Sequence, residues 1–482
     1  MSEFAKGSLS TKLYYGFGSV AYGVKDNGFA FFLLLYYNQV LGLPAPWVGA
    51  AILLALVFDA VSDPIVGYTS DNLHSRWGRR HPFMYASAAP VAVSFYLLWN
   101  PPAGLEGKGL LAYLLALSIL VRTFITFYEI PSSSLVAELT DDYDERTSML
   151  GFRYFFGWWG GLTMALVAYF FLLRATPEYP VGQLNPAGWR DYGLISSGIM
   201  LFAILVSALG THRHIPYLKQ PPEKRRFSAG RSLRELGETL SNRSFLVLFA
   251  SALFGAMAAG LTTSLNIYFN TYFWELSPNQ IGILTFGPLL SSTLALIAAP
   301  KLSRRLGKKR AAVLVYGLAI VVAPVPIVGR LAGIMPPNGS PALLPTLFGF
   351  VVIEVSLIVT ASILMSSMVA DTVEDSQLTT GRRSEGVFFA ARSFIQKSVH
   401  GIGVLTATLV LTAIQFPQGA KPGEVDLAVV AKLGLVYVPA LVVLYVISLL
   451  FVAAYHISRA THQANLARLA DSAGGARRCR SR

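Results

Sequence analysis

Two aspartates stand one helical turn apart in a stretch that is otherwise apolar. Asp59 and Asp63 follow residues 47–58, which carry no charge. A carboxylate inside a bilayer costs at least a few kcal/mol and usually faces a cavity in which it acts, and a spacing of four residues places both on one helix face. Two like charges this close are relieved by a cation or a proton. Ser62 adds a hydroxyl and Pro64 frees a backbone carbonyl, so the stretch predicts a cation site made of oxygen ligands.

A structural alternative remains open for this pair. Either aspartate could cap a helix or form an ion pair with an arginine from a neighbouring span. Both interpretations require membrane-spanning helices around the carboxylates.

The composition is that of a polytopic membrane protein. The chain has 482 residues, of which 54% are hydrophobic and 13% charged, and its mean hydropathy is +0.52. Soluble domains carry about 25% charged residues. The net charge of +13 lies in short loops between apolar runs, which is typical of orientation in a membrane and does not indicate a nucleic-acid partner. The single cysteine, Cys479, excludes an intrachain disulfide.

Twelve apolar runs are long enough to cross a bilayer. They lie near residues 13–38, 47–70, 82–100, 109–137, 150–173, 192–212, 245–273, 280–303, 311–333, 344–370, 386–415 and 430–456. Basic clusters occupy alternate connections, so we expect both termini in the cytoplasm and the chain in a bacterial inner membrane. The predicted domains are a six-helix bundle over 1–212, a cytoplasmic middle loop over 213–243, a second six-helix bundle over 244–460 and a basic cytoplasmic tail over 461–482.

A weak internal repeat relates the two halves. Residues 75–80 after the second span are echoed by 303–309 after the eighth, and 136–142 after the fourth span by 369–375 after the tenth. Equivalent signals in two six-helix halves predict parallel repeats with a binding site between them. The predicted fold is an all-α polytopic membrane protein with twelve transmembrane helices, in two six-helix bundles of major facilitator architecture.

Specific motifs narrow the class further. The first span contains Lys12–Gly18, then Lys25-Asp26 and Tyr36-Tyr37; the second carries Asp59–Gly67, followed by Ser75–Pro82. Together these motifs resemble the glycoside–pentoside–hexuronide:cation symporter family, the group of the melibiose permease. The resemblance covers all twelve spans.

The resemblance implies roles for residues at matching positions. Asp59, Asp63 and Thr126 match cation ligands, with Ser62 beside them. Asp26 and Glu129 match acidic residues that hydrogen-bond sugar hydroxyls, although the second is more often Asp. Arg153 and Lys397 match buried basic residues that link the sugar site to the carboxylates. All six charged groups lie within apolar spans, where their opposite signs allow pairing.

Four positions depart from the melibiose permease. Ser62 stands where that protein has Asn, a residue tied to ion choice, so Na⁺ and H⁺ both remain open. Ser133 and Ser362 replace tryptophans that flank the sugar, and Arg392 replaces a neutral amide. A wider, less aromatic and more positive pocket favours an acidic sugar, a larger glycoside or an amphipathic solute.

These observations predict a secondary active transporter that functions as a monomer. We expect alternating access, with a sugar, glycoside or hexuronide-like solute carried together with H⁺ or Na⁺, and no cofactor apart from that ion; Asp59 and Asp63 are metal ligands only if the ion is Na⁺. One alternative is symport of an amphipath such as a lysolipid or a steroid-like compound. Another is a non-transporting membrane sensor with a transporter fold. No motif for phosphate binding, zinc hydrolysis or a nucleophilic serine is present, so the sequence does not predict an enzyme.

Overall fold

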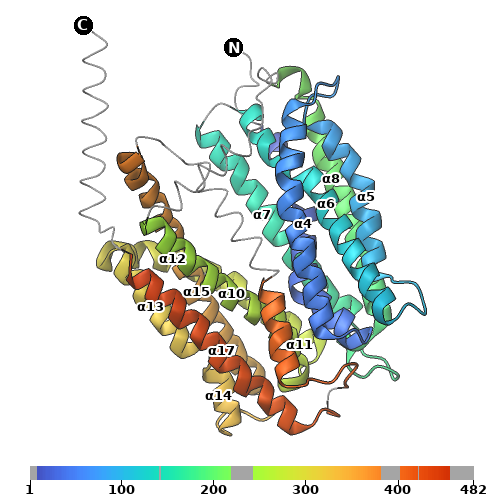
Figure 1. The fold of residues 1–482 in the computed structure, drawn as a ribbon, viewed down its shortest axis with the longest axis vertical. Coiled ribbons are helices and arrows are strands. Elements are labelled where there is room, and N and C mark those ends of the chain that lie inside the picture. The colour runs from blue at the N-terminus through green and yellow to red at the C-terminus, as the bar shows by residue number, and fades with distance from the viewer. Residues whose placement is uncertain (1–7, 141–142, 219–242, 381–401, 422, 456–482) are drawn as a thin grey trace. The chain divides into compact units, whose positions relative to one another are not determined.

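The computed structural model describes residues 8–140, 143–218, 243–380, 402–421 and 423–455 (Figure 1). The regular elements in these ranges are helices, with no strand among them. An all-helical chain satisfies its backbone hydrogen bonds internally, as a bilayer requires.

Nine helical stretches within the described residues are long and apolar enough to cross a membrane. They are His81–Trp99, Gly107–Val136, Ser148–Leu172, Pro186–His212, Leu246–Phe273, Pro278–Leu306, Lys308–Leu331, Leu343–Met365 and Leu427–Ala453. Each coincides with a predicted span. The predicted first and second spans are also helical, and Ile402–Ala413 is the described part of the eleventh. The twelve-helix prediction is therefore confirmed.

The first span is a helix in segments. It comprises α1 (Leu9–Phe17), α2 (Ser19–Asn27), the wide, π-helical turn η2 (Gly28–Phe32), α3 (Leu33–Leu35) and a second wide turn of this kind, η3 (Tyr36–Val40). In η3 the Leu41 N–H bonds the Tyr36 carbonyl five residues back, at 3.0 Å. Such wide turns are rare and frequently lie at functional sites. Similar turns end the helices of the fifth and seventh spans, in η4 (Ala168–Leu172) and η7 (Phe269–Phe273).

The remaining spans of the first half are longer helices. They are α4 (Ala45–Asn72), α5 (His81–Trp99), α6 (Gly107–Leu139), α7 (Tyr143–Val167) and α8 (Pro186–His212). Glycines allow α2 and α7 to approach closely, since a Cβ on Gly23 would lie 1.9 Å from the Gly157 carbonyl oxygen. The α4 helix runs unbroken from Ala45 to Asn72 and carries both aspartates of the predicted cation site.

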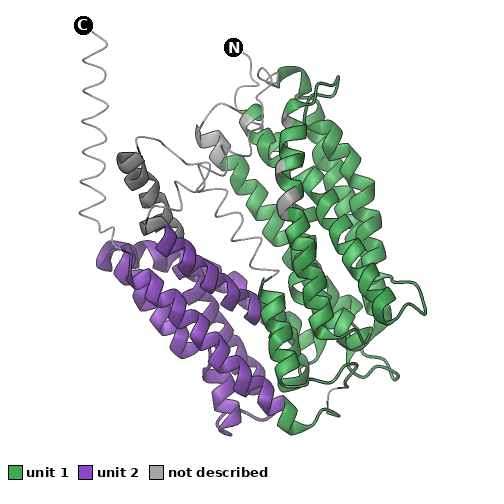
Figure 2. Cartoon of the chain, viewed as in Figure 1, with its two compact units in different colours: residues 1–227, 263–282, 400–429 green, residues 228–262, 283–399, 430–482 purple. Residues whose placement is uncertain are grey.

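The second half contains α10 (Arg243–Tyr268), α11 (Pro278–Leu284), α12 (Gly287–Leu306), α13 (Lys308–Val322), α14 (Val325–Leu331), α15 (Leu343–Thr380) and α17 (Leu427–Ala453). The chain forms two compact units (Figure 2). Unit 1 comprises residues 1–227, 263–282 and 400–429, and unit 2 comprises 228–262, 283–399 and 430–482.

A buried polar network explains why parts of the second half belong to unit 1. The Tyr268 hydroxyl donates to Asn38 Oδ1 at 2.8 Å, and the Tyr272 hydroxyl donates to Gln39 Oε1 at 3.2 Å. Gln39 Nε2 donates in turn to the Pro417 carbonyl at 3.1 Å. Because buried polar groups must find partners, these bonds tie the ends of three spans together. We call them the Asn38–Gln39 network.

Candidate functional site

The predicted cation ligands converge between α4 and α6. The Thr126 hydroxyl lies 3.1 Å from Asp59 Oδ1 and 3.0 Å from Asp63 Oδ1. Thr126 is 1% exposed and Asp59 4%, while Asp63 is partly buried. The second and fourth spans run in the same direction, so one turn of α6 can meet one turn of α4.

The single hydrogen of the Thr126 hydroxyl limits the hydrogen bonds that Thr126 can donate. A threonine hydroxyl has one hydrogen to donate, yet two carboxylate oxygens lie within hydrogen-bonding distance of it. Thr126 can satisfy one of these contacts at a time. A proton on one carboxyl would turn the other contact into a hydrogen bond as well, and a cation could instead coordinate both carboxylates and the hydroxyl. Three hard oxygens suit Na⁺, Li⁺ or H⁺ better than a soft metal.

A residue that sequence reasoning missed lies on the other side of Asp59. Arg122 Nη1 is 3.4 Å from Asp59 Oδ2, and both side chains are buried. Arg122 precedes Thr126 by one turn of α6, so the two residues hold the two oxygens of one carboxylate. The signal in the sequence was a lone arginine inside an apolar span. The ion pair with a neighbouring arginine, which the sequence left open, is therefore present at Asp59 together with the oxygen cluster.

Ser62 is directed toward its own helix. Its hydroxyl donates to the Asp59 carbonyl at 3.1 Å, one turn back in α4. The hydrogen of the serine hydroxyl is occupied by this backbone bond.

Asp26 has a close basic partner in the preceding residue. Lys25 Nζ lies 2.6 Å from Asp26 Oδ1, and the lysine side chain is 7% exposed against 40% for the aspartate. The sequence motif included Lys25 but no role was assigned to it. Asp26 therefore offers an accessible carboxylate whose charge is offset by a buried ammonium.

Arg153 occupies a polar position between α6 and the first span. Its Nη1 donates to Ser132 Oγ at 2.9 Å and its Nη2 donates to the Glu129 backbone carbonyl at 3.3 Å. The guanidinium also lies over the Tyr22 ring, 5.2 Å from its centroid. Within the described part of the chain, the Glu129 carboxylate itself accepts no hydrogen bond. Arg153 and Glu129 are thus brought together through the backbone, which leaves that carboxylate available.

The remaining predicted substrate residues are only partly covered. Ser133 and Ser362 donate to carbonyls of their own helices, at 2.8 and 2.9 Å respectively. Ser133 belongs to unit 1 and Ser362 to unit 2. Lys397 and Arg392 lie outside the described residues.

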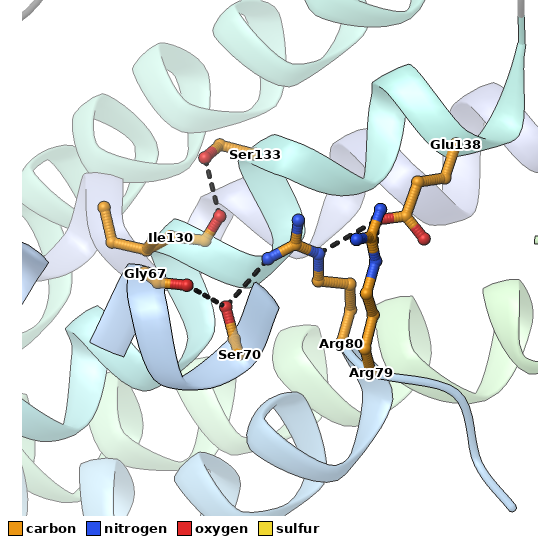
Figure 3. Close-up of polar contacts among 7 residues, drawn as sticks. All are labelled: Gly67, Ser70, Arg79, Arg80, Ile130, Ser133 and Glu138. Atoms are coloured by element: carbon orange, nitrogen blue, oxygen red, sulfur yellow. Dashed lines mark hydrogen bonds and ion pairs between the residues drawn. The ribbon is translucent and has the colours of Figure 1, made fainter. Parts of the chain in front are cut away.

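A second charged cluster lies at the end of α6 (Figure 3). Glu138 Oε1 accepts from Arg79 at 2.7 Å and from Arg80 at 3.0 Å. Arg80 also donates to Ser70 Oγ at 2.8 Å. All of these residues belong to unit 1, where they fix the loop before α5 against α4 and α6. This Glu138 cluster is structural in character and is separate from the cation ligands.

One further intramembrane acid was missed by the sequence analysis. Glu354 lies within the apolar part of α15 and within electrostatic range of Tyr437 and Tyr445 on α17. No hydrogen bond or ion pair reaches its carboxylate from the described residues. An isolated acid within the predicted tenth span was the available signal.

The described residues hold no group of three or more His, Cys, Asp or Glu side chains that could bind a metal.

Comparisons with known proteins agree with this architecture. Residues 14–459 match the family model described as MFS/sugar transport protein. An uncharacterized symporter of Synechocystis sp. is 27% identical, over 86% of this chain and 87% of its own length. The isoprimeverose transporter of Lactiplantibacillus pentosus is 26% identical over 79% and 75%. The sphingosine-1-phosphate transporter of Mus musculus is 27% identical over 92% and 89%.

Solved structures agree on the fold. The crystal structure of a D-xylose-proton symporter superposes with a TM-score of 0.58 at 14% identity, covering 90% of this chain and 96% of that one. At this identity the likeness concerns the arrangement of helices. The two-bundle, twelve-helix prediction is in agreement with it.

Proposed function

The chain belongs to the MFS/sugar transport protein family and is a secondary transporter in the membrane, and from this premise we propose that it couples a cation, H⁺ or Na⁺, to the uptake of a sugar-like solute. The solute class is a sugar, a glycoside or a hexuronide. The mechanism is alternating access, in which one site opens to each side of the membrane in turn.

One observation carries the cation half of this proposal. Asp59, Asp63 and Thr126 converge at about 3 Å with a single hydroxyl hydrogen for two carboxylates. Enclosing two carboxylates in a medium of low dielectric constant is costly, and this cost is reduced by Arg122 beside Asp59 and reduced further by a bound cation. Occupancy by a cation therefore permits the conformational change, which is the basis of coupling.

The solute half of the proposal is supported by the polar groups of unit 1. Asp26 and Glu129 present carboxylates for sugar hydroxyls, while Arg153 and Lys25 supply nearby positive charge. Ser133, Ser362, Lys397 and Arg392 complete the proposed set from the sequence. An anionic sugar suits this excess of basic groups better than a neutral one.

A second candidate solute has its own support. The similarity to a sphingosine-1-phosphate transporter extends over 92% of the chain, and serines stand where tryptophans would narrow the pocket. An amphipath with an anionic headgroup would use the same basic residues and require a wider, less aromatic site. This alternative keeps the transporter and changes the cargo.

The proposal also covers the membrane location, the orientation and the oligomeric state. We place the protein in a bacterial inner membrane with both termini in the cytoplasm, because basic clusters occupy alternate loops. Each twelve-span chain contains a full pathway and acts as a monomer.

Solute accumulation in proteoliposomes tests the proposal. Glucuronate, methyl glucoside and lysophosphatidate, a lysolipid with an anionic headgroup, are supplied as labelled solutes, with an imposed Na⁺ or H⁺ gradient. Wild type should concentrate one of them under one gradient. Asp59→Asn should abolish that accumulation while retaining solute binding, and the exposed Asp191→Asn serves as the matched control. Accumulation by Asp59→Asn at the wild-type level would refute the assigned cation site.

A further inference from the structure

Arg122 is a buried guanidinium that is weakly held. Arg122 is 5% exposed, and within the described residues its one hydrogen bond is to Asp59, at 3.4 Å. Charge-assisted N–H···O bonds are usually about 2.7–2.9 Å long. The Nε atom is buried without a hydrogen-bond partner among those residues. A guanidinium carries five N–H donors, so this contact leaves Arg122 far from saturated.

The ring of Phe29 gives the guanidinium a second stabilising contact. The Arg122 Cζ atom lies 4.9 Å from the ring centroid, within the range at which the face of an aromatic ring attracts a cation. Phe29 belongs to η2, the wide turn of the first span. Arg122 therefore retains a favourable neighbour if Asp59 turns to another cation.

The position of Arg122 affects the binding of any second cation. An ion held by Asp59, Asp63 and Thr126 would lie within a few ångströms of the guanidinium, where like charges repel strongly in a low-dielectric medium. Conversely, Arg122 neutralises Asp59 when the ion is absent. The guanidinium and the ion thus compete for one carboxylate.

We propose that Arg122 is a tethered cation that occupies Asp59 when the coupling site is empty and is displaced when an inorganic monovalent cation binds. This inference rests on the proposed function, since it presumes that Asp59, Asp63 and Thr126 bind the coupling ion. In this proposal Arg122 determines how tightly the site binds the ion. Its charge keeps the affinity low enough for the ion to leave on the cytoplasmic side of the membrane. It also limits the cost of enclosing the ion-free carrier, because one carboxylate remains neutralised.

Ion-dependent thermal stability of the purified full chain tests this proposal. NaCl or LiCl replaces choline chloride at constant ionic strength and pH 8, without solute, and the concentration giving half of the stability shift is measured. We expect Arg122→Gln to lower that concentration at least about tenfold, which corresponds to about 1.4 kcal/mol. Arg122→Lys retains the charge and should stay within about threefold of wild type.

Two further variants control for the loss of an arginine elsewhere and for misfolding of Arg122→Gln. Arg174→Gln removes an exposed guanidinium whose Nε bonds the Phe171 carbonyl, and it should leave ion affinity unchanged. Arg122→Met keeps an apolar stem against Phe29 and replaces Arg122→Gln if that variant does not fold.

The outcomes separate the inference from the proposed function. Equal ion affinity in wild type and in a folded, uncharged Arg122 variant overturns the tethered cation and leaves the cation site standing. A stability shift that appears or strengthens only when the charge is removed supports the tether. Absence of any response to Na⁺ and Li⁺ in wild type and in the uncharged Arg122 variants overturns the Na⁺ or Li⁺ site that the inference presumes. Asp59→Asn, which removes the shared carboxylate charge, should abolish the difference between Arg122 and its uncharged variants.

Discussion

Thr126→Val isolates one atom of the candidate cation site. Valine has the shape of threonine without its hydroxyl, so both carboxylate contacts, at 3.1 and 3.0 Å, are lost together. In the filled site the hydroxyl oxygen would instead ligate the ion, and a polar contact with a charged group contributes about 1.5–3 kcal/mol. At about 1.4 kcal/mol per factor of ten, the affinity for the coupling ion should fall by about 10- to 150-fold. Thr126→Ser retains the hydroxyl and should remain within about threefold of wild type.

The assay is the thermal stability of the purified protein in rising NaCl, in rising LiCl and across pH. Wild type and Thr126→Ser should respond at similar ion concentrations, whereas Thr126→Val should require much higher ones. A Thr126→Val protein that is folded and responds as wild type does would refute the reasoning, because the hydroxyl would then be a helix-packing group. An equal loss in the serine variant would point to packing and not to ligation.

Three further outcomes are expected. Glu138→Gln removes the carboxylate charge that pairs with the buried Arg80 and the partly buried Arg79 and should cost about 3–5 kcal/mol of stability, measured as a lower melting temperature; an unchanged temperature would contradict the pairing. Gly23→Ala should prevent folding or lower the melting temperature, because its Cβ would meet the Gly157 carbonyl at 1.9 Å, whereas Gly151→Ala, with nothing within 4 Å, should be neutral. Burial, and then a neighbouring arginine, lower the pKa of His214 from 6.5, so the unfolded chain takes up the proton first. Stability should therefore fall as the pH drops through about 6.5, and His214→Gln should lose that slope in melting curves between pH 5 and 8.

Apolar run length was sufficient to predict the helices. Every span predicted by length and hydropathy has a described helix at its place, and α4 remains helical through Pro64. The segmentation of the first span could not be predicted in the same way. A wide turn such as Gly28–Phe32 differs from the adjoining helix by one residue in its hydrogen-bond spacing, and neither propensity nor hydropathy responds to so small a change.

The candidate site was predictable within one helix and less so between helices. The spacing of Asp59 and Asp63 follows from the period of a helix, so their shared face needed no structure. Thr126 entered through the family resemblance. Arg122 was missed because its partner lies 63 positions away in the chain. The pattern of residues on one helix face does not reveal which neighbouring helix packs against that face. Lys25 was read as part of a motif, and its ion pair with Asp26 became evident from the side-chain geometry.

The Asn38–Gln39 network contains amides, phenols and backbone carbonyls. None of these groups changes its charge between about pH 4 and pH 9 in its ordinary range. The strength of the Asn38–Gln39 network therefore stays the same when the surrounding medium becomes acidic or alkaline. By the predicted orientation the network faces the exterior, where a cell has least control over acidity. Changes in pH and salt therefore leave this contact unchanged, whereas by the proposed function they act on the carboxylates of α4.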